Sequence, residues 1–415
     1  DFRKALEEVS GIDLESFFEQ WLYSPGFPDY FVNYTWNQET KTVELTIEQT
    51  NAESEGVPLF SNPIEISFTM EHGSILRKIR METKKQAFFF SLDTPPVNIN
   101  LDPKNWILKN LKFRKPVEMH IHQLKHDENA MERIRAAQEL EGLTTADAIR
   151  ALGESIDQDK FWGVRLEAAR ALGKIGTKAA FEVLLSKVNH KDHKARRGVA
   201  AGLRGFNGTE VSEAAVEALV KLLENDQSYY TRAYAAHSLG YYKKSEIAFQ
   251  ALKANLAQDS HNDIVRYGIF QGFGEMGDPR AIPLAIDYLQ HGKHFYGRMY
   301  AAYALGRIGK GDQKALDVLL ETRREGDVHV KEAAAESVAL LNDTSAIPSL
   351  EEWLSKEMEG RVRRMLRESI YNLKERLLQT EQLSKISGDV EKISSDAKRA
   401  NERISSLEAS VLHNT

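Results

Sequence analysis

The stretch VRLEAARALGKIG (Val164–Gly176) decides the fold. A basic residue is followed by small residues three and four positions later, and by a large apolar residue seven positions later. The same pattern recurs at intervals of 31 to 36 residues, with its basic positions at Arg133, Arg165, Arg196, Arg232, Arg266, Arg298, Lys331 and Arg363. A period of that length is typical of stacked helix pairs. The sequence therefore predicts an α-solenoid of stacked helix pairs over residues 114–378.

Each position of the pattern predicts a role. Small residues such as Ala168 and Ala169 let neighbouring helices approach, and a large residue such as Leu172 fills the core. The pattern also places a glycine at the expected end of four helices, at Gly173, Gly240, Gly274 and Gly306.

The positions one and five residues after the basic residue should face the inner, concave surface of the solenoid. From the first repeat to the last, the side chains at these positions form a column that changes from basic through aromatic to acidic. Tyrosine rings there suit peptide or protein contact, and the acidic end would favour a basic group. Ordinary packing between repeats is the alternative interpretation. The candidate binding residues are Arg170, Arg197, His237, Tyr267, Gln271, Met299, Tyr303, Glu332 and Glu336.

The basic column itself admits two interpretations. It could form an anion-binding stripe. The regular repeats resemble HEAT repeats, and such repeats favour a structural ladder instead, in which each basic side chain bonds to a carbonyl or an aspartate in the turn of the neighbouring repeat, such as Asp192, Asp226 or Asp259.

The segments before and after the helical repeats have different spacings of apolar residues. Residues 1–28 read as helices, and alternating apolar residues in 29–113 predict a small antiparallel β-sandwich, followed by a polar connector at 112–123. In the tail, 379–415, a heptad seam runs through Leu383, Ile386, Val390, Ile393, Ala397, Ala400, Ile404, Leu407 and Val411. It predicts either weak self-association through 383–411 or a helix folded back on the solenoid.

Composition excludes several classes of protein. The 415 residues carry a net charge of −6 with both signs interleaved, which gives no electrostatic argument for nucleic-acid binding. No run approaches the ~20 apolar residues of a membrane helix. The absence of cysteine excludes disulfides and thiolate metal sites. The compartment stays open, and we expect the cytoplasm. The chain begins inside a helical pattern without methionine, so we expect a piece of a longer protein.

The N-terminal stretch FRKALEEVSGIDLESFFEQWL (Phe2–Leu22), followed by Gly26-Phe27-Pro28, resembles the end of the catalytic domain in M1-family zinc aminopeptidases. In that family a β-sandwich and a helical superhelical domain follow, which is the order predicted here. The resemblance implies a metallopeptidase parent, or a degenerate relative of one. A preceding catalytic domain would then be the first partner of this chain.

The departures from that family bear on activity. The zinc-binding His-Glu-x-x-His motif and the Gly-x-Met-Glu-Asn motif of the family do not occur in this sequence. We therefore expect no catalytic residue, metal ligand or cofactor in this chain, with zinc bound in the parent protein if that is catalytic. The one dense histidine cluster, His120, His122 and His126 beside Asp127 and Glu128, could ligate zinc, but reads better as a solvated connector.

Three functions remain open at this stage. The chain can be the non-catalytic C-terminal part of a zinc aminopeptidase, shaping its substrate chamber. It can be a protein-binding scaffold from a catalytically inactive M1 relative, a class that includes transcription-initiation subunits. It can also be a HEAT-repeat adaptor whose aminopeptidase resemblance is only ancestry.

Overall fold

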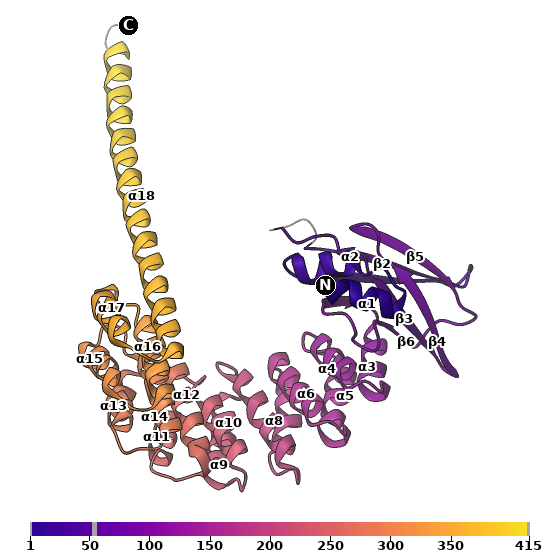
Figure 1. Ribbon diagram of the computed structural model, residues 1–415, viewed down its shortest axis with the longest axis horizontal. Coiled ribbons are helices and arrows are strands. Elements are labelled where there is room, and N and C mark those ends of the chain that lie inside the picture. The colour runs from indigo at the N-terminus through magenta and orange to yellow at the C-terminus, as the bar shows by residue number, and fades with distance from the viewer. Residues whose placement is uncertain (1, 52–55, 413–415) are drawn as a thin grey trace. The chain divides into compact units, whose positions relative to one another are not determined.

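The computed structural model describes residues 2–51 and 56–412 (Figure 1). The chain divides into two compact units, residues 1–218 and 219–415. The first unit holds the N-terminal helices, the β-sandwich and the first helical repeats, and the second holds the later repeats and the C-terminal helix. Among the described residues, no helix has an apolar stretch of the length needed to cross a membrane.

The N-terminal segment forms α1 (Phe2–Ser10), α2 (Glu15–Phe18) and the π-helical turn η1 (Glu19–Tyr23). Trp21 fixes this segment to the sandwich: its ring lies 4.8 Å from that of Phe60, and its Nε1–H donates to Asn62 Oδ1 at 3.3 Å. Phe18 is buried beneath the same turn. A set of large apolar side chains stays exposed around it: Phe2, Val9, Ile12, Phe17, Leu22 and Tyr23.

Seven strands follow, and they form two sheets with the orders β5-β2-β1-β7 and β4-β3-β6. The strands are β1 (Asp29–Asn37), β2 (Thr42–Gln49), β3 (Pro63–Met70), β4 (Gly73–Arg80), β5 (Lys85–Ser91), β6 (Asn98–Leu101) and β7 (Asn110–Arg114).

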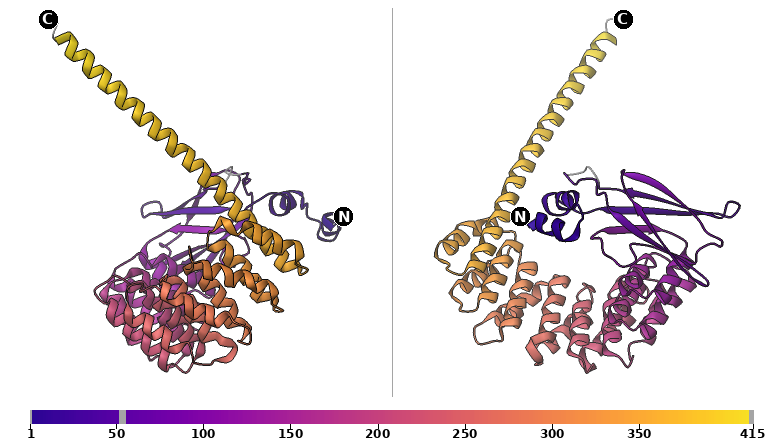
Figure 2. Two further views of the ribbon diagram at one scale, coloured as in Figure 1. Left: turned by 90° about the vertical axis from the view of Figure 1, so that its left-hand side faces the viewer. Right: turned by 45° about the vertical axis from the view of Figure 1, so that its right-hand side comes forward.

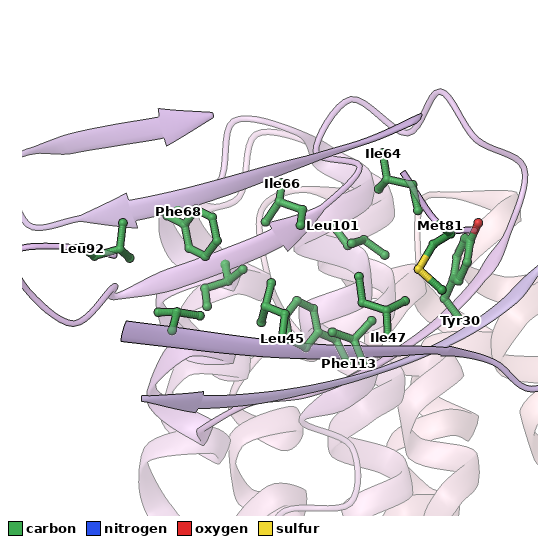
Figure 3. Close-up of a cluster of buried hydrophobic side chains, with 13 residues drawn as sticks. Tyr30, Leu45, Ile47, Ile64, Ile66, Phe68, Met81, Leu92, Leu101 and Phe113 are labelled. Atoms are coloured by element: carbon green, nitrogen blue, oxygen red, sulfur yellow. The ribbon is translucent and has the colours of Figure 1, made fainter. Parts of the chain in front are cut away.

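The inward-facing residues of both sheets make one core, in which Leu45, Ile47, Ile66 and Phe68 are buried (Figure 3). This confirms the period-two interpretation of these strands. The sandwich is not wholly antiparallel, however, because β7 pairs in parallel with β1. The chain crosses from β6 to the other sheet through residues 102–109, so β7 arrives beside β1 in the same direction.

Helical repeats occupy the rest of the chain. The first unit contains α3 (Val117–His126), α4 (Ala130–Glu139), α5 (Ala146–Gln158), α6 (Trp162–Ile175), α7 (Lys178–Ser186), α8 (His193–Leu203) and η2 (Arg204–Phe206). Helix α9 (Ser212–Asn225) spans the division between the units. The second unit continues with α10 (Tyr229–Leu239), α11 (Glu246–Asn255), η3 (His261–Asp263), α12 (Ile264–Met276), η4 (Pro279–Ala281), α13 (Ile282–Leu289), α14 (Phe295–Ile308), α15 (Gln313–Glu321), η5 (Thr322–Arg324), α16 (Val328–Leu340), η6 (Thr344–Ala346), α17 (Ile347–Lys356) and α18 (Gly360–Leu412).

The helices that carry the repeated pattern pack side by side in one layer. In the second unit this layer consists of α10, α12, α14, α16 and the start of α18. The pattern residues behave as predicted: Ala168, Ala169 and Leu172 are fully buried in α6. The small side chains bring the backbones of successive helices together, and the large one fills the space between the layers.

The prediction that four glycines end helices is wrong for Gly173, Gly274 and Gly306, which lie inside α6, α12 and α14. A Cβ on Gly173 would lie 2.2 Å from the carbonyl oxygen of Gly202 in α8. The glycine is therefore needed for close approach of two helices. The true C-terminal cap of α6 is Gly176, whose φ of 65° is left-handed.

The structural ladder of basic residues is confirmed. Each basic side chain reaches the turn at the end of a helix in its own or the next repeat. Arg133 binds Asp159 through two nitrogens, at 2.7 and 2.9 Å. Arg165 contacts Asp192 at 2.6 Å, and Arg266 contacts Asp259 at 2.6 Å. The Arg133 and Arg165 pairs connect successive helix pairs, as expected, whereas Arg266 binds the turn of its own helix pair rather than that of a neighbouring repeat.

The predicted connector is wrong: β7 and α3 occupy it, and α3 packs against the sandwich. His120 is buried in α3, and burial together with the nearby Lys115 charge lowers the pKa of His120 to about 3. A buried network joins the sandwich to the repeats. We call it the junction network: Asn98, Asn100, Asp102, Asn105, Lys109, Lys115, Gln123, Asp127, Glu132 and Arg135.

Helix α18 begins in the last repeat and continues as one uninterrupted helix (Figure 2). Four residues of the predicted heptad seam, Leu383, Ile386, Val390 and Ile393, are exposed. They therefore do not pack against the repeats, which contradicts the folded-back alternative for this part of the tail. The side chains of Ala397, Ala400, Ile404, Leu407 and Val411 lie outside the described ones, and self-association stays a prediction.

Candidate functional site

A groove of about 430 Å³ opens on the layer formed by α12, α14 and α16. We call it the tyrosine groove. Three neighbouring repeats contribute to it, so its walls belong to one packed layer of the second unit. Its lining residues are Tyr267, Phe270, Gln271, Tyr300, Tyr303, Ala304, Arg307, Glu336 and Leu340.

Helical spacing places these side chains on one face. Tyr267 and Gln271 are four residues apart on α12, and Glu336 and Leu340 are four apart on α16. Residues three or four positions apart lie one above the other on a helix. The fully buried small residues of the repeated pattern point the other way, into the core. The half-buried tyrosines are consequently left on the surface of the layer.

The aromatic rings form a continuous run. The ring centroids of Tyr267 and Tyr300 lie 4.1 Å apart, and those of Tyr300 and Tyr303 lie 6.0 Å apart. Phe270, buried beneath them, closes the floor. Each tyrosine offers a large apolar face with one hydroxyl group, a combination that is enriched at energetically important positions of protein interfaces.

The charged groups of the groove differ in their pairing. Arg307 is held at the rim, because its Nη1 lies 2.6 Å from Glu275 Oε1. The Glu336 carboxylate accepts a hydrogen bond from the Tyr303 hydroxyl, and burial together with this carboxylate raises the pKa of Tyr303. Within the described parts of the chain, Glu336 forms no ion pair with a lysine or arginine. The groove thus carries one acidic group without a basic partner.

The structure brings together four of the nine predicted binding residues: Tyr267, Gln271, Tyr303 and Glu336. Three others, His237, Met299 and Glu332, are half-buried on the same unit but do not line the groove.

Arg170 and Arg197 belong to the first unit. Arg197 lies over the Trp162 ring at 4.6 Å, and Arg170 lies 3.6 Å from Glu167. The wider rule that both column positions are exposed is wrong for Leu166, Ala201 and Ala233, which are buried. Close packing of the small-residue helices covers those three positions.

Sequence reasoning missed Tyr300, Arg307 and Leu340. Tyr300, Tyr303 and Arg307 occupy positions i, i+3 and i+7 on α14, so they share one face of that helix. Following the face of α14 that carries Tyr303 by one helical turn in each direction would have predicted Tyr300 and Arg307. Leu340 follows Glu336 by one turn in the same way.

Two further grooves lie elsewhere and are weaker candidates. One, of about 510 Å³, includes Arg323, Arg324, Lys331 and Trp353, but Lys331 there is paired with Glu357 at 2.9 Å. The other, of about 550 Å³, lies between α5 and α7 and contains no aromatic residue. The first groove has one aromatic residue, the buried Trp353, and the second has none, so neither presents a run of aromatic faces.

The structure does not gather the candidate histidines into a metal site. The His122 and His126 rings are 4.8 Å apart on α3, and His120 is buried nearby. Among the residues described, no three His, Asp or Glu side chains converge in a way that could hold a metal ion. The tyrosine groove likewise offers one carboxylate and no histidine, which suits contact with a peptide better than metal binding.

Comparison with known proteins identifies the repeats. Residues 117–205, 216–306 and 286–370 match the family model of HEAT repeats, which is more than half of the chain. The chain therefore belongs to the HEAT-repeat family. This agrees with the stacked helix pairs and with the ladder of basic residues.

Two relatives with the same name are similar in sequence to part of this chain. Transcription initiation factor TFIID subunit 2 of Drosophila melanogaster is 24% identical over 203 residues, which is 42% of this chain and 17% of that protein. The Danio rerio protein of the same name is 25% identical over 204 residues, again 42% and 17%. The chain thus matches about a sixth of the length of these relatives.

Among solved structures, Legionella pneumophila aminopeptidase A, in complex with aspartic acid, is similar in fold. The TM-score is 0.56 at 16% identity, and the likeness covers 89% of this chain and 51% of that chain. The order of terminal helices, sandwich and helical repeats therefore has a counterpart in an aminopeptidase structure.

Proposed function

We propose that this chain is the sandwich and solenoid part of an M1-like protein without peptidase activity of its own, and that its solenoid is a scaffold for protein binding. In this proposal the tyrosine groove holds an extended segment of a partner protein. The observation that carries the proposal is the run of three adjoining tyrosine rings in a groove of about 430 Å³.

Two properties of the groove support protein binding. Its walls come from three stacked repeats, so the site is preorganised and little ordering is needed when a segment binds. Its aromatic faces and hydroxyl groups match those of interface residues with large binding contributions. The similarity to transcription initiation factor TFIID subunit 2, a protein named as a subunit of a factor, is in keeping with a scaffold.

The N-terminal helices support a second contact of the scaffold. Phe2, Val9, Phe17 and Leu22 are exposed around the buried Phe18 and the half-buried Trp21. A cluster of large exposed apolar groups marks an interaction surface. We propose that it packs against a preceding M1-like domain, as the resemblance of Phe2–Leu22 implies.

An enzymatic parent is the alternative, and the fold likeness to aminopeptidase A favours it. In that case zinc would be bound by the preceding domain, and this solenoid would border the substrate chamber. The residues N-terminal to Asp1 discriminate between the two functions. A His-Glu-x-x-His motif with a downstream glutamate there would favour the enzyme, and its loss would favour the scaffold.

The scaffold proposal is tested by paired substitutions in the full-length protein. Tyr267→Ala with Tyr303→Ala should weaken binding of co-purifying partners by about 1–3 kcal/mol while the circular dichroism spectrum stays unchanged. Tyr229→Ala with Tyr230→Ala is the matched control, because both rings are exposed on α10 outside the groove. If both pairs reduce binding equally, or if neither does, the tyrosine groove is not the binding site.

A further inference from the structure

The tyrosine groove combines aromatic faces with an acidic group, Glu336, that forms no ion pair with a basic side chain among the described residues. Tyr300 lies between the rings of Tyr267 and Tyr303, and Glu336 stands beside Tyr303. The other charged residue that lines the groove, Arg307, is already paired with Glu275 at 2.6 Å. The charge that the groove presents to an incoming group is therefore that of Glu336.

A half-buried carboxylate bound by a single hydroxyl group keeps accepting capacity, because each carboxylate can accept several hydrogen bonds. A neutral partner group would satisfy some of that capacity without balancing the charge. A cation would do both, and the faces of the neighbouring tyrosine rings attract cations through their quadrupoles. The groove is thus complementary to a basic side chain.

The planar guanidinium group fits this combination better than an ammonium group does. Arginine can stack on an aromatic face while two of its N–H groups donate to one carboxylate, whereas lysine presents a compact and strongly hydrated charge. The groove offers ring faces and a carboxylate side by side. It therefore matches arginine in shape as well as in charge.

The same chain already uses this combination within its own repeats. The guanidinium carbon of Arg280 lies 4.0 Å from the ring centroid of Phe249, and its Nη1 lies 3.0 Å from Glu246 Oε2. Arg266 likewise lies 5.2 Å from the Tyr288 ring while it contacts Asp263 at 2.6 Å. In the tyrosine groove the ring and the carboxylate are present, and the arginine is the component that a partner would supply.

We propose that the tyrosine groove recognises an arginine side chain in an extended segment of the partner protein, with Glu336 pairing with the guanidinium group and the tyrosine rings stacking on it. This inference rests on the proposed function, since it names the chemistry of the segment that the groove binds. The proposal requires a single arginine side chain and no further charged feature of the partner.

The test uses small probes and the whole chain. The chain is labelled with ¹³C at alanine and leucine methyl groups, because Ala304 and Leu340 line the groove. It is titrated with N-acetyl-arginine methylamide, with the uncharged isostere N-acetyl-citrulline methylamide, and with N-acetyl-lysine methylamide. The variant is Glu336→Gln, which keeps an acceptor for the Tyr303 hydroxyl group. The matched control is Glu321→Gln, an exposed carboxylate on α15 outside the groove.

The arginine probe should shift the Ala304 and Leu340 signals and bind at least about tenfold more tightly than the citrulline probe. Glu336→Gln should remove that difference, and Glu321→Gln should keep it. Equal binding of arginine and citrulline, or full arginine binding by Glu336→Gln, would overturn the inference. Equal binding of lysine and arginine would overturn the preference for a guanidinium group. Loss of partner binding in the paired tyrosine variant would still stand in those cases, so the two proposals fail separately.

Discussion

The junction network and the tyrosine groove both contain carboxylates that are at least half-buried, but the two regions differ in how these carboxylates are paired. In the junction network, Asp102 pairs with Lys109, and their side chains are only 5% and 1% exposed. In the tyrosine groove, Glu336 is half-buried and has one hydroxyl partner. The first region is saturated from within the chain, and the second leaves a charge for something outside it.

This difference separates structure from recognition. A buried charge without a partner costs several kcal/mol, so saturated networks of this kind position one element against another. The junction network holds α3 and α4 against β6 of the sandwich. An open and unsaturated site is tolerated where solvent reaches it, and it is then free to bind. Substitutions should therefore have large effects on stability in the junction network and small ones in the tyrosine groove.

The largest effect is expected for Asp102→Ala. The substitution leaves Lys109 buried without its carboxylate and also removes the acceptor for the Trp106 and Ile107 backbone amides. Breaking a buried pair in this way should lower the free energy of unfolding by about 3–5 kcal/mol. Denaturant unfolding measures it.

The control for this substitution is Asp147→Ala. Its pair with Arg150 is exposed, with side chains 69% and 63% accessible, so the loss should stay below about 1 kcal/mol. Similar losses for the two variants would show that the pairing of buried charges in the junction network does not stabilise the fold.

Gly173→Ala should have the next largest effect. The added Cβ would lie 2.2 Å from the Gly202 carbonyl oxygen, so α6 and α8 must move apart. Overpacking of this kind costs about 1–3 kcal/mol, despite the better helix propensity of alanine. Gly142→Ala, where nothing lies within 4 Å of the new Cβ, is the control. A thermal melt that shows Gly173→Ala to be as stable as the parent would refute the close helix contact.

A pH effect follows from His120. Its folded pKa of about 3 lies below the ordinary histidine pKa of 6.5, so the unfolded chain binds the proton first as the pH falls. The free energy of unfolding should therefore decrease between pH 6.5 and 3, with a slope of at most about 1.4 kcal/mol per pH unit from this residue. Above pH 6.5 the contribution is constant.

Comparison of variants isolates that contribution. Between pH 7.5 and 4.5, His120→Gln should lose about 2–3 kcal/mol less stability than the parent chain. His72→Gln, at an exposed turn, should behave like the parent. Parallel pH profiles for all three chains would mean that His120 is not protected from protonation.

Much of the fold could be predicted because the repeats encode it locally. Ala168, Ala169 and Leu172 occupy fixed positions in a pattern that returns every 31 to 36 residues, and the copies adopt the predicted burial except at Arg367, which is exposed. The alternating residues of the sandwich are equally direct. The errors came from contacts between elements: Gly173 is a glycine because of Gly202 in the next repeat, which periodicity within one helix does not reveal.

The candidate site was predicted in part for the same reason. Tyr267, Gln271, Tyr303 and Glu336 follow from their positions within single repeats. Tyr300 and Arg307 required the face of α14 to be followed beyond the repeated pattern. His120 could not be placed from sequence, because its burial depends on the way in which α3 packs on the sandwich.

The smallest effect on stability is expected for Glu336→Gln, the substitution in the tyrosine groove. Glu336 has no ion pair to lose within the described parts of the chain, and glutamine can still accept from Tyr303. The free energy of unfolding should change by less than about 0.5 kcal/mol, as for a typical surface position. Denaturant unfolding of Glu336→Gln beside Asp102→Ala gives the contrast directly. A loss of several kcal/mol for Glu336→Gln would mean that its carboxylate is satisfied within the fold, and the charge assigned to a partner's arginine would then already be used by the chain itself.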